Sequence, residues 1–152
     1  TSFAPVNINW QLMKNIFIID WILIIVSILS AFSGIELHIA GHRSVHELWH
    51  NWAVFHVLAS FLFFMTAIFH ITTHWGWYKG IIRKGIGKKS KITVALSIVF
   101  LLVSVTGVVL LAVNGANSAM GLWHYRIGII TVALSAGHIL KRTPLLRKSL
   151  KQ

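Results

Sequence analysis

The chain has 152 residues, of which 56% are hydrophobic and 11% charged, and its formal net charge is +11. A soluble domain carries about 25% charged residues, so this composition indicates a membrane protein. It argues against a nucleic-acid-binding protein, which would add positive charge to a polar surface. Because the sequence has no cysteine, it provides no disulfide, no cysteine-ligated iron–sulfur cluster and no covalent haem attachment.

Four apolar stretches are long enough to cross the hydrocarbon layer of a bilayer, which takes about 20 helical residues. They cover about residues 15–37, 51–73, 92–113 and 121–140, and both prolines, Pro5 and Pro144, lie outside them. A spanning segment must satisfy its own backbone hydrogen bonds, and barrel strands are only about 9–11 residues long, so helices are predicted. We expect an all-α membrane protein: one integral membrane domain over residues 1–152, folded as a four-helix transmembrane bundle in the lipid bilayer.

Basic residues gather on one side of this expected bundle. Twelve of the 14 precede the first stretch, follow the fourth, or lie between the second and third, and only Arg43 and Arg126 fall on the other side. The positive-inside rule then places both termini in the cytoplasm, and we expect a prokaryotic inner (cytoplasmic) membrane. The glycine-rich basic segment 79–90 is interpreted as a topology signal facing anionic lipid, with no nucleic acid as partner.

Four of the nine histidines repeat one spacing inside the second and fourth stretches. His56 and His70 are 14 residues apart, as are His124 and His138. Fourteen steps of about 100° return to within about 40°, so each pair shares a helix face, with its members about 21 Å apart along the axis. The two helices run in the same direction. His56 can therefore face His124 near the outer surface, and His70 can face His138 near the inner surface.

Two axial imidazoles from facing helices are what a six-coordinate haem b requires, and bundle interiors hold such cofactors. The spacing therefore predicts two haem b groups. The alternative is that these histidines only form hydrogen bonds between helices, but four in matched register favour ligation. Gly34 and Gly107, which follow Ser33 and Thr106, are expected to let a porphyrin approach the backbone. Small residues also serve plain helix packing in membranes.

These paired helices resemble those of the membrane di-haem cytochromes b. The four-helix size, the Ser33-Gly34 and Thr106-Gly107 positions and the segment 70–77 (HITTHWGW) look most like the flavinylation-associated cytochrome group, with kinship to cytochrome b561 and hydrogenase-type cytochrome b subunits. The resemblance implies that His56 and His124 bind an outer haem, and that His70 and His138 bind an inner one. It also implies electron exchange between membrane quinone and a periplasmic or cytoplasmic redox protein.

Another set of histidines recurs every four residues in the outer connection: His38, His42, His46 and His50. If that segment is helical, its adjacent members differ by about 40° and form one stripe. Such a stripe is a candidate site for a transition metal, although surface histidines usually have no special role. Propionate contacts, a proton relay at a quinone site or a docking surface are the alternatives.

Other polar residues are candidates for contacts around the haems. His74 competes with His70 as the inner ligand, or contacts a propionate or quinone. Arg126 and Arg43 are candidate propionate contacts, although arginines near an interface also snorkel to the headgroups. Asp20 is an acidic group in a hydrocarbon-spanning stretch, so it is either a proton-handling residue or a group at the cytoplasmic edge.

The predicted function is transmembrane electron transfer through the two haems. One alternative is a self-contained haem oxidoreductase that acts on ferric ions or superoxide at the outer face. Another is a haem-free, histidine-rich metal-binding or transport membrane protein.

Overall fold

The computed structural model describes residues 5–41, 46–87, 90–113 and 118–149. Within these ranges the regular structure is entirely helical, which confirms the all-α prediction. The helices are α1 (Pro5–Gly41), α2 (His46–Thr73), α3 (Trp75–Lys84), α4 (Lys91–Ala112) and α5 (Ala119–Ser149).

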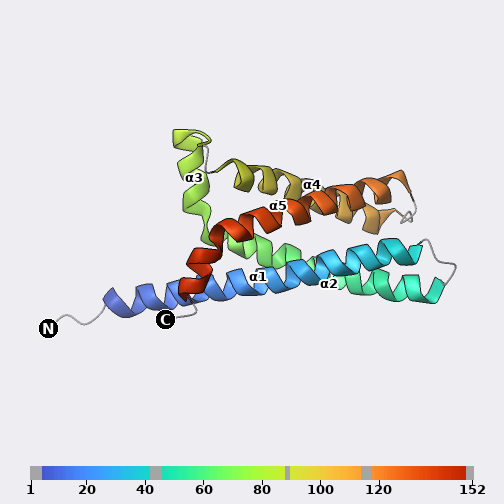
Figure 1. Cartoon of the computed structure of the whole chain (residues 1–152), viewed down its shortest axis with the longest axis horizontal. Coiled ribbons are helices and arrows are strands. Elements are labelled where there is room, and N and C mark those ends of the chain that lie inside the picture. Colours follow the sequence, from blue (N-terminus) through green and yellow to red (C-terminus); the bar gives the residue numbers. More distant parts are fainter. Residues whose placement is uncertain (1–4, 42–45, 88–89, 114–117, 150–152) are drawn as a thin grey trace.

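The four long helices form two antiparallel hairpins, α1 with α2 and α4 with α5, which extend along one common direction (Figure 1). The hairpins approach each other mainly through α1 and α5. Between α2 and α4 the contact is aromatic: the ring of Phe100 lies 5.6 Å from that of Phe63 and 6.1 Å from that of Phe64, measured between centroids. The hairpins are therefore joined along one pair of helices and by a group of aromatic side chains in the other pair.

The outer surface of this bundle is apolar. Among the described residues only five small side chains are buried: Ser33, Ala40, Ala59, Ala67 and Thr131. Large aliphatic side chains such as Leu101 and Val108 are more than half exposed. Within the described ranges, three helical segments are long and apolar enough to cross a membrane: Ile16–Gly41, Glu47–Thr73 and Lys91–Ala112. This surface suits a lipid bilayer, in which exposed hydrophobic side chains carry no penalty.

Helix α5 differs from the fourth stretch that the sequence predicts. It contains residues 121–140 but is not among the helices apolar enough to count as a span, since His124, Arg126 and His138 lie within it. It also continues beyond residue 140, so that Pro144 lies inside a helix. A proline in a helix interior removes one backbone hydrogen bond and bends the helix, and the end of α5 turns away from the long axis (Figure 1).

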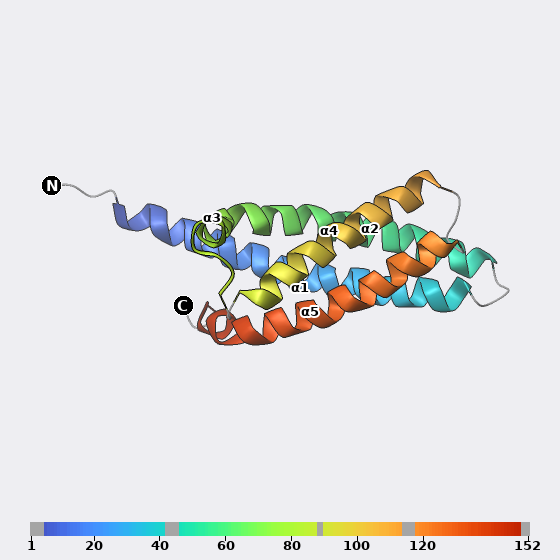
Figure 2. The ribbon, with the colours of Figure 1, turned by 90° about the horizontal axis from the view of Figure 1, so that it is seen from above.

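The basic connection between α2 and α4 contains a helix that the sequence analysis treats only as a topology signal. Helix α3 runs across the direction of the long helices, and Figure 2 shows it end-on at one end of the bundle. The hydroxyl groups of Tyr78 and Ser97, which lie 2.9 Å apart, connect it to α4. Helix α3 is amphipathic, as is typical of a helix lying in a membrane interface. Its apolar Trp75, Tyr78 and Ile82 recur at helical spacing on one face. The basic pair Arg83 and Lys84 lies away from that face.

Candidate cofactor site: four histidines in two layers

The four paired histidines lie in two layers along the bundle, and every long helix contributes to both layers. The first, here called the His56 layer, comprises Ser33, His56, Thr106 and His124. The second, here called the His70 layer, comprises Asp20, His70, Thr93 and His138. In each layer α2 and α5 supply the histidines, and α1 and α4 supply the side chains that contact them.

The two imidazoles of the His56 layer face each other across the hairpins. Their ring centroids are 6.2 Å apart and their planes are inclined by 73°. A metal–imidazole bond is about 2.0–2.1 Å long and the ring centre lies about 1 Å beyond the nitrogen, so two imidazoles on opposite sides of one metal have centroids about 6 Å apart. The separation of His56 and His124 therefore fits a pair of axial ligands.

Hydrogen bonds at Nδ1 define which nitrogen of His56 carries the proton. Nδ1 lies 3.0 Å from Ser33 Oγ and 3.2 Å from the carbonyl oxygen of Ser30. The Ser33 hydroxyl donates its own proton to that same carbonyl, at 3.0 Å. A carbonyl only accepts, so the ring must donate from Nδ1. The remaining nitrogen, Nε2, is then an unprotonated acceptor, which is the form that binds a metal.

The second histidine of this layer repeats the arrangement. Nδ1 of His124 lies 2.9 Å from Thr106 Oγ1, and the ring also hydrogen-bonds to the backbone of Val103. The Thr106 hydroxyl donates to backbone carbonyls one turn earlier, at 2.9 and 3.0 Å. The proton between Thr106 and the imidazole therefore also belongs to Nδ1, and Nε2 of His124 is again the free acceptor.

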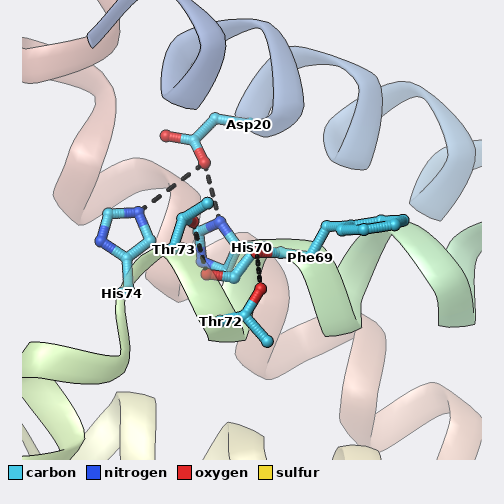
Figure 3. A network of polar contacts seen from close by, with 6 residues as sticks. All are labelled: Asp20, Phe69, His70, Thr72, Thr73 and His74. Carbon is cyan, nitrogen blue, oxygen red and sulfur yellow. Dashed lines mark hydrogen bonds and ion pairs between the residues drawn. The ribbon is translucent and has the colours of Figure 1, made fainter. Parts of the chain in front are cut away.

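The His70 layer has the same plan with one different partner. Nδ1 of His70 lies 2.7 Å from Oδ1 of Asp20, as Figure 3 shows, and Nδ1 of His138 lies 3.2 Å from Thr93 Oγ1. A carboxylate accepts, so His70 donates from Nδ1. His138 also interacts electrostatically with His70 and Asp20 across the hairpins. The fold thus brings the second pair, His70 and His138, to one level of the bundle.

His74 is a second imidazole beside Asp20. Its Nε2 lies 3.9 Å from the same carboxylate oxygen, and its ring centroid is 4.7 Å from that of His70 (Figure 3). The ligand atoms of Asp20, His70 and His74 lie within 4.8 Å of one another, and in the described part of the chain they are the one such group of three. Both histidines that compete for the inner position are therefore within reach of one ion.

The partners on α1 and α4 follow a register that the sequence analysis missed. Asp20 and Ser33 are 13 residues apart, as are Thr93 and Thr106, close to the 14-residue spacing of the histidines. A single offset of 73 residues relates the corresponding positions of the two helices: Asp20 and Thr93, Ser30 and Val103, Ser33 and Thr106, Gly34 and Gly107. The offset of the glycine pair can be read from the sequence, and applied to Asp20 it leads to Thr93.

The two glycines make room for the imidazoles of the His56 layer. A Cβ added at Gly34 would lie 2.9 Å from Cε1 of His56, and one added at Gly107 would lie 3.1 Å from Cε1 of His124. At Gly128 and Gly137 of α5 an added Cβ would meet nothing within 4 Å. Close approach of the histidine ring is the local reason for these glycines, and their contact with a porphyrin stays a prediction.

The outer histidines do not form one helical stripe. Helix α1 ends at Gly41 and α2 begins at His46, so the segment is divided between two antiparallel helices. His42 and Arg43 lie outside the described residues. Because these are two separate helices, the condition for one stripe is not met. Within the described ranges, neither His38 nor His50 belongs to a group of three metal-ligating side chains.

Contacts near the His56 layer involve two other candidates. His38 stacks on Tyr125, with ring centroids 3.8 Å apart and planes inclined by 13°, which joins the ends of α1 and α5. The guanidinium carbon of Arg126 lies 5.6 Å from the centre of the Trp123 ring, an arrangement suited to a cation–π contact. A propionate contact by Arg126 stays a prediction.

Comparison of the chain with protein families, curated proteins and solved structures finds no match. The chemistry of the site is therefore inferred from its own residues.

Proposed function

We propose that the chain is a di-haem cytochrome b that transfers electrons across a membrane. In this proposal α5 is the fourth span of a four-helix transmembrane bundle. His56 and His124 are the axial ligands of one haem b, and His70 and His138 are those of the other. The observation that carries the proposal is that all four imidazoles have their Nδ1 engaged by a side chain in matched register, which leaves Nε2 of each as the nitrogen that can bind a metal.

The facing pair in the His56 layer supports ligation over plain hydrogen bonding between helices. Both imidazoles hold their proton on Nδ1, so neither Nε2 has a proton to share with the other ring. Two unprotonated nitrogens within one layer can instead share a cation between them. Nε2 of His56 has a long side-chain hydrogen bond of 3.4 Å to the Ser60 hydroxyl, which a stronger ligand bond could replace.

The protein residues would supply position and environment, while the haem supplies one-electron redox chemistry. The 14-residue spacing sets the two ligand levels about 21 Å apart. By the positive-inside rule, the basic residues of α3 support a cytoplasmic position for the His70 layer. Electrons would pass between membrane quinone and a redox protein, and His74 and Arg126 are the residues available for quinone or propionate contacts.

The test is a reduced-minus-oxidised spectrum of the purified chain together with its haem content. Two bis-imidazole haems per chain are expected, and a chain that binds none refutes the proposal. His56→Ala and His124→Ala should remove one and the same centre, while His70→Ala and His138→Ala should remove the other. His50→Ala, at an exposed position, is the control that should keep both. Any other grouping of losses refutes the ligand pairs. Turnover with quinol and added acceptors then distinguishes a conduit from a self-contained oxidoreductase.

One observation favours a second candidate, a haem-free metal-binding membrane protein. Asp20, His70 and His74 provide one carboxylate and two imidazoles, a ligand set suited to zinc, copper or iron. In this case His74→Ala should abolish binding of zinc added alone to the purified chain. In the di-haem protein the same substitution should leave both haem centres in place.

A further inference from the structure

We propose that Asp20 gives the centre of the His70 layer a lower reduction potential than that of the His56 layer, so that electrons move from the Asp20 end of the bundle toward the Ser33 end. This inference rests on the proposed function and adds a direction to it. It assigns Asp20 as a positioning residue that acts through His70.

The evidence is a chemical difference at one of four equivalent contacts. Ser33, Thr93 and Thr106 meet their histidines with a neutral hydroxyl at 2.9–3.2 Å. Asp20 meets His70 with a carboxylate oxygen at 2.7 Å, the shortest of the four contacts. The register of α1 and α4 makes Thr93 the counterpart of Asp20 on the opposite ligand of the same layer. The carboxylate is thus a departure from an otherwise repeated plan.

A carboxylate at this position acts on the metal through the imidazole. When it accepts the Nδ1 proton in a hydrogen bond, it makes the ring a more basic ligand, which stabilises the more positive, oxidised iron. Its negative charge acts in the same sense, and charge interactions are stronger in the low dielectric of a membrane interior than in water. A serine or threonine hydroxyl orients the imidazole in the same way but adds no negative charge.

Cations near the same layer oppose this effect. Lys141 and Arg142 interact electrostatically with His138, and both are exposed on α5. Exposed charges are screened by solvent and salt, whereas Asp20 is in direct contact with the ligand and its side chain is 18% exposed. The cations act on His138 from exposed positions, whereas the carboxylate contacts the ligand His70 directly, so we expect the carboxylate to dominate and the His70 layer to be the more reducing centre.

The test is a spectroelectrochemical titration of the full chain in lipid nanodiscs, with the centre of the His70 layer identified by its loss in His70→Ala. Asp20→Asn keeps the shape and removes the charge, and Asp20→Thr installs the residue found at its counterpart. Each should favour the reduced state of that centre by at least tenfold, which is about 59 mV for a one-electron couple. The His56-layer centre should change by less than twofold. Glu36→Gln is the matched control, because it removes one acidic charge from α1 near the His56 layer.

The reciprocal exchange separates the effect of charge from that of local structure. In the Asp20→Thr background, Thr93→Asp should restore the low potential from the other side of the layer. If the Asp20 variants lose the haem, Thr93→Asp alone is the test. It should favour the oxidised state of the same centre by at least tenfold. Unchanged potentials in these variants, with both haems bound, refute the role of Asp20 and leave the proposed function standing. A wild-type chain without haem refutes both.

Discussion

Replacing Gly34 with alanine should displace His56 and weaken haem binding in the His56 layer. The added Cβ would lie 2.9 Å from Cε1 of the imidazole, whereas ordinary contacts begin at 3.4 Å. The ring must therefore move by roughly 0.5 Å, the tolerance within which a functional group has to be held. The ring cannot swing freely, because its Nδ1 is bonded both to Ser33 and to the backbone of Ser30.

The expected loss of haem affinity is opposite in sign to the usual effect of replacing glycine with alanine on helix stability. In a helix interior alanine is more favourable than glycine by about 1 kcal/mol, so an uncrowded exchange should stabilise the chain. Loss of ligand orientation costs about 10- to 100-fold in metal affinity, and we expect Gly34→Ala to weaken haem binding at this layer at least tenfold. Gly107→Ala should have a smaller effect, because its Cβ would lie 3.1 Å from His124.

Haem titration of the purified variants, followed by difference spectra, measures this effect. Gly128→Ala and Gly137→Ala are the controls, since an added Cβ meets nothing within 4 Å at either position. The controls should bind both haems as the unchanged chain does, and Gly34→Ala should bind haem at least tenfold more weakly in the His56 layer alone. If Gly34→Ala binds two haems as tightly as the controls, the ring of His56 does not occupy the ligand position inferred here.

Three further predictions concern separate features. Ser33→Ala removes the side-chain partner of the His56 ring and should lower haem affinity at that layer about 10- to 100-fold in a haem titration; an unchanged affinity would mean that the hydroxyl does not orient the ligand. Tyr78→Phe removes the hydrogen bond from α3 to α4 and should lower the free energy of unfolding by about 0.5–1.5 kcal/mol in thermal or denaturant unfolding, whereas no loss would show that α3 docks by other contacts. Because the sequence has no cysteine, single cysteines at Ser118 and Lys141 report on α5, and they should react with an impermeant reagent from opposite sides of the membrane; labelling from one side would contradict a fourth span.

The histidine layers could be predicted from sequence because a helix fixes the angle and the rise of each residue. A spacing of 14 residues on two helices places His56 and His124 at one level and His70 and His138 at another without any knowledge of packing. The partners of the histidines could not be selected in the same way. Serine and threonine are common in membrane helices, and which of them meets an imidazole depends on the rotation and depth of α1 and α4, which only packing determines.

The limits of the predicted helices have local physical reasons. The row from His38 to His50 has helical spacing, yet α1 ends at Gly41, where the chain must reverse to form a hairpin. The basic connection has an amphipathic period that emerges only over the ten residues of α3, in a segment dominated by its charges. The end of α5 could not be predicted because a proline such as Pro144 normally marks the end of a helix, whereas here it lies inside one.

Helices α1 and α4 run in the same direction, as do α2 and α5, so the directions of the two hairpins are related by a rotation about an axis along the bundle (Figure 1). Such an axis passes through both layers, so it exchanges the two faces of each site and never exchanges the sites themselves. In the His56 layer the exchange relates one hydroxyl-held imidazole to another. In the His70 layer it relates Asp20 to Thr93, so the two faces are chemically unequal. A planar group held between the hairpins would meet matched surroundings at one level and polarised surroundings at the other.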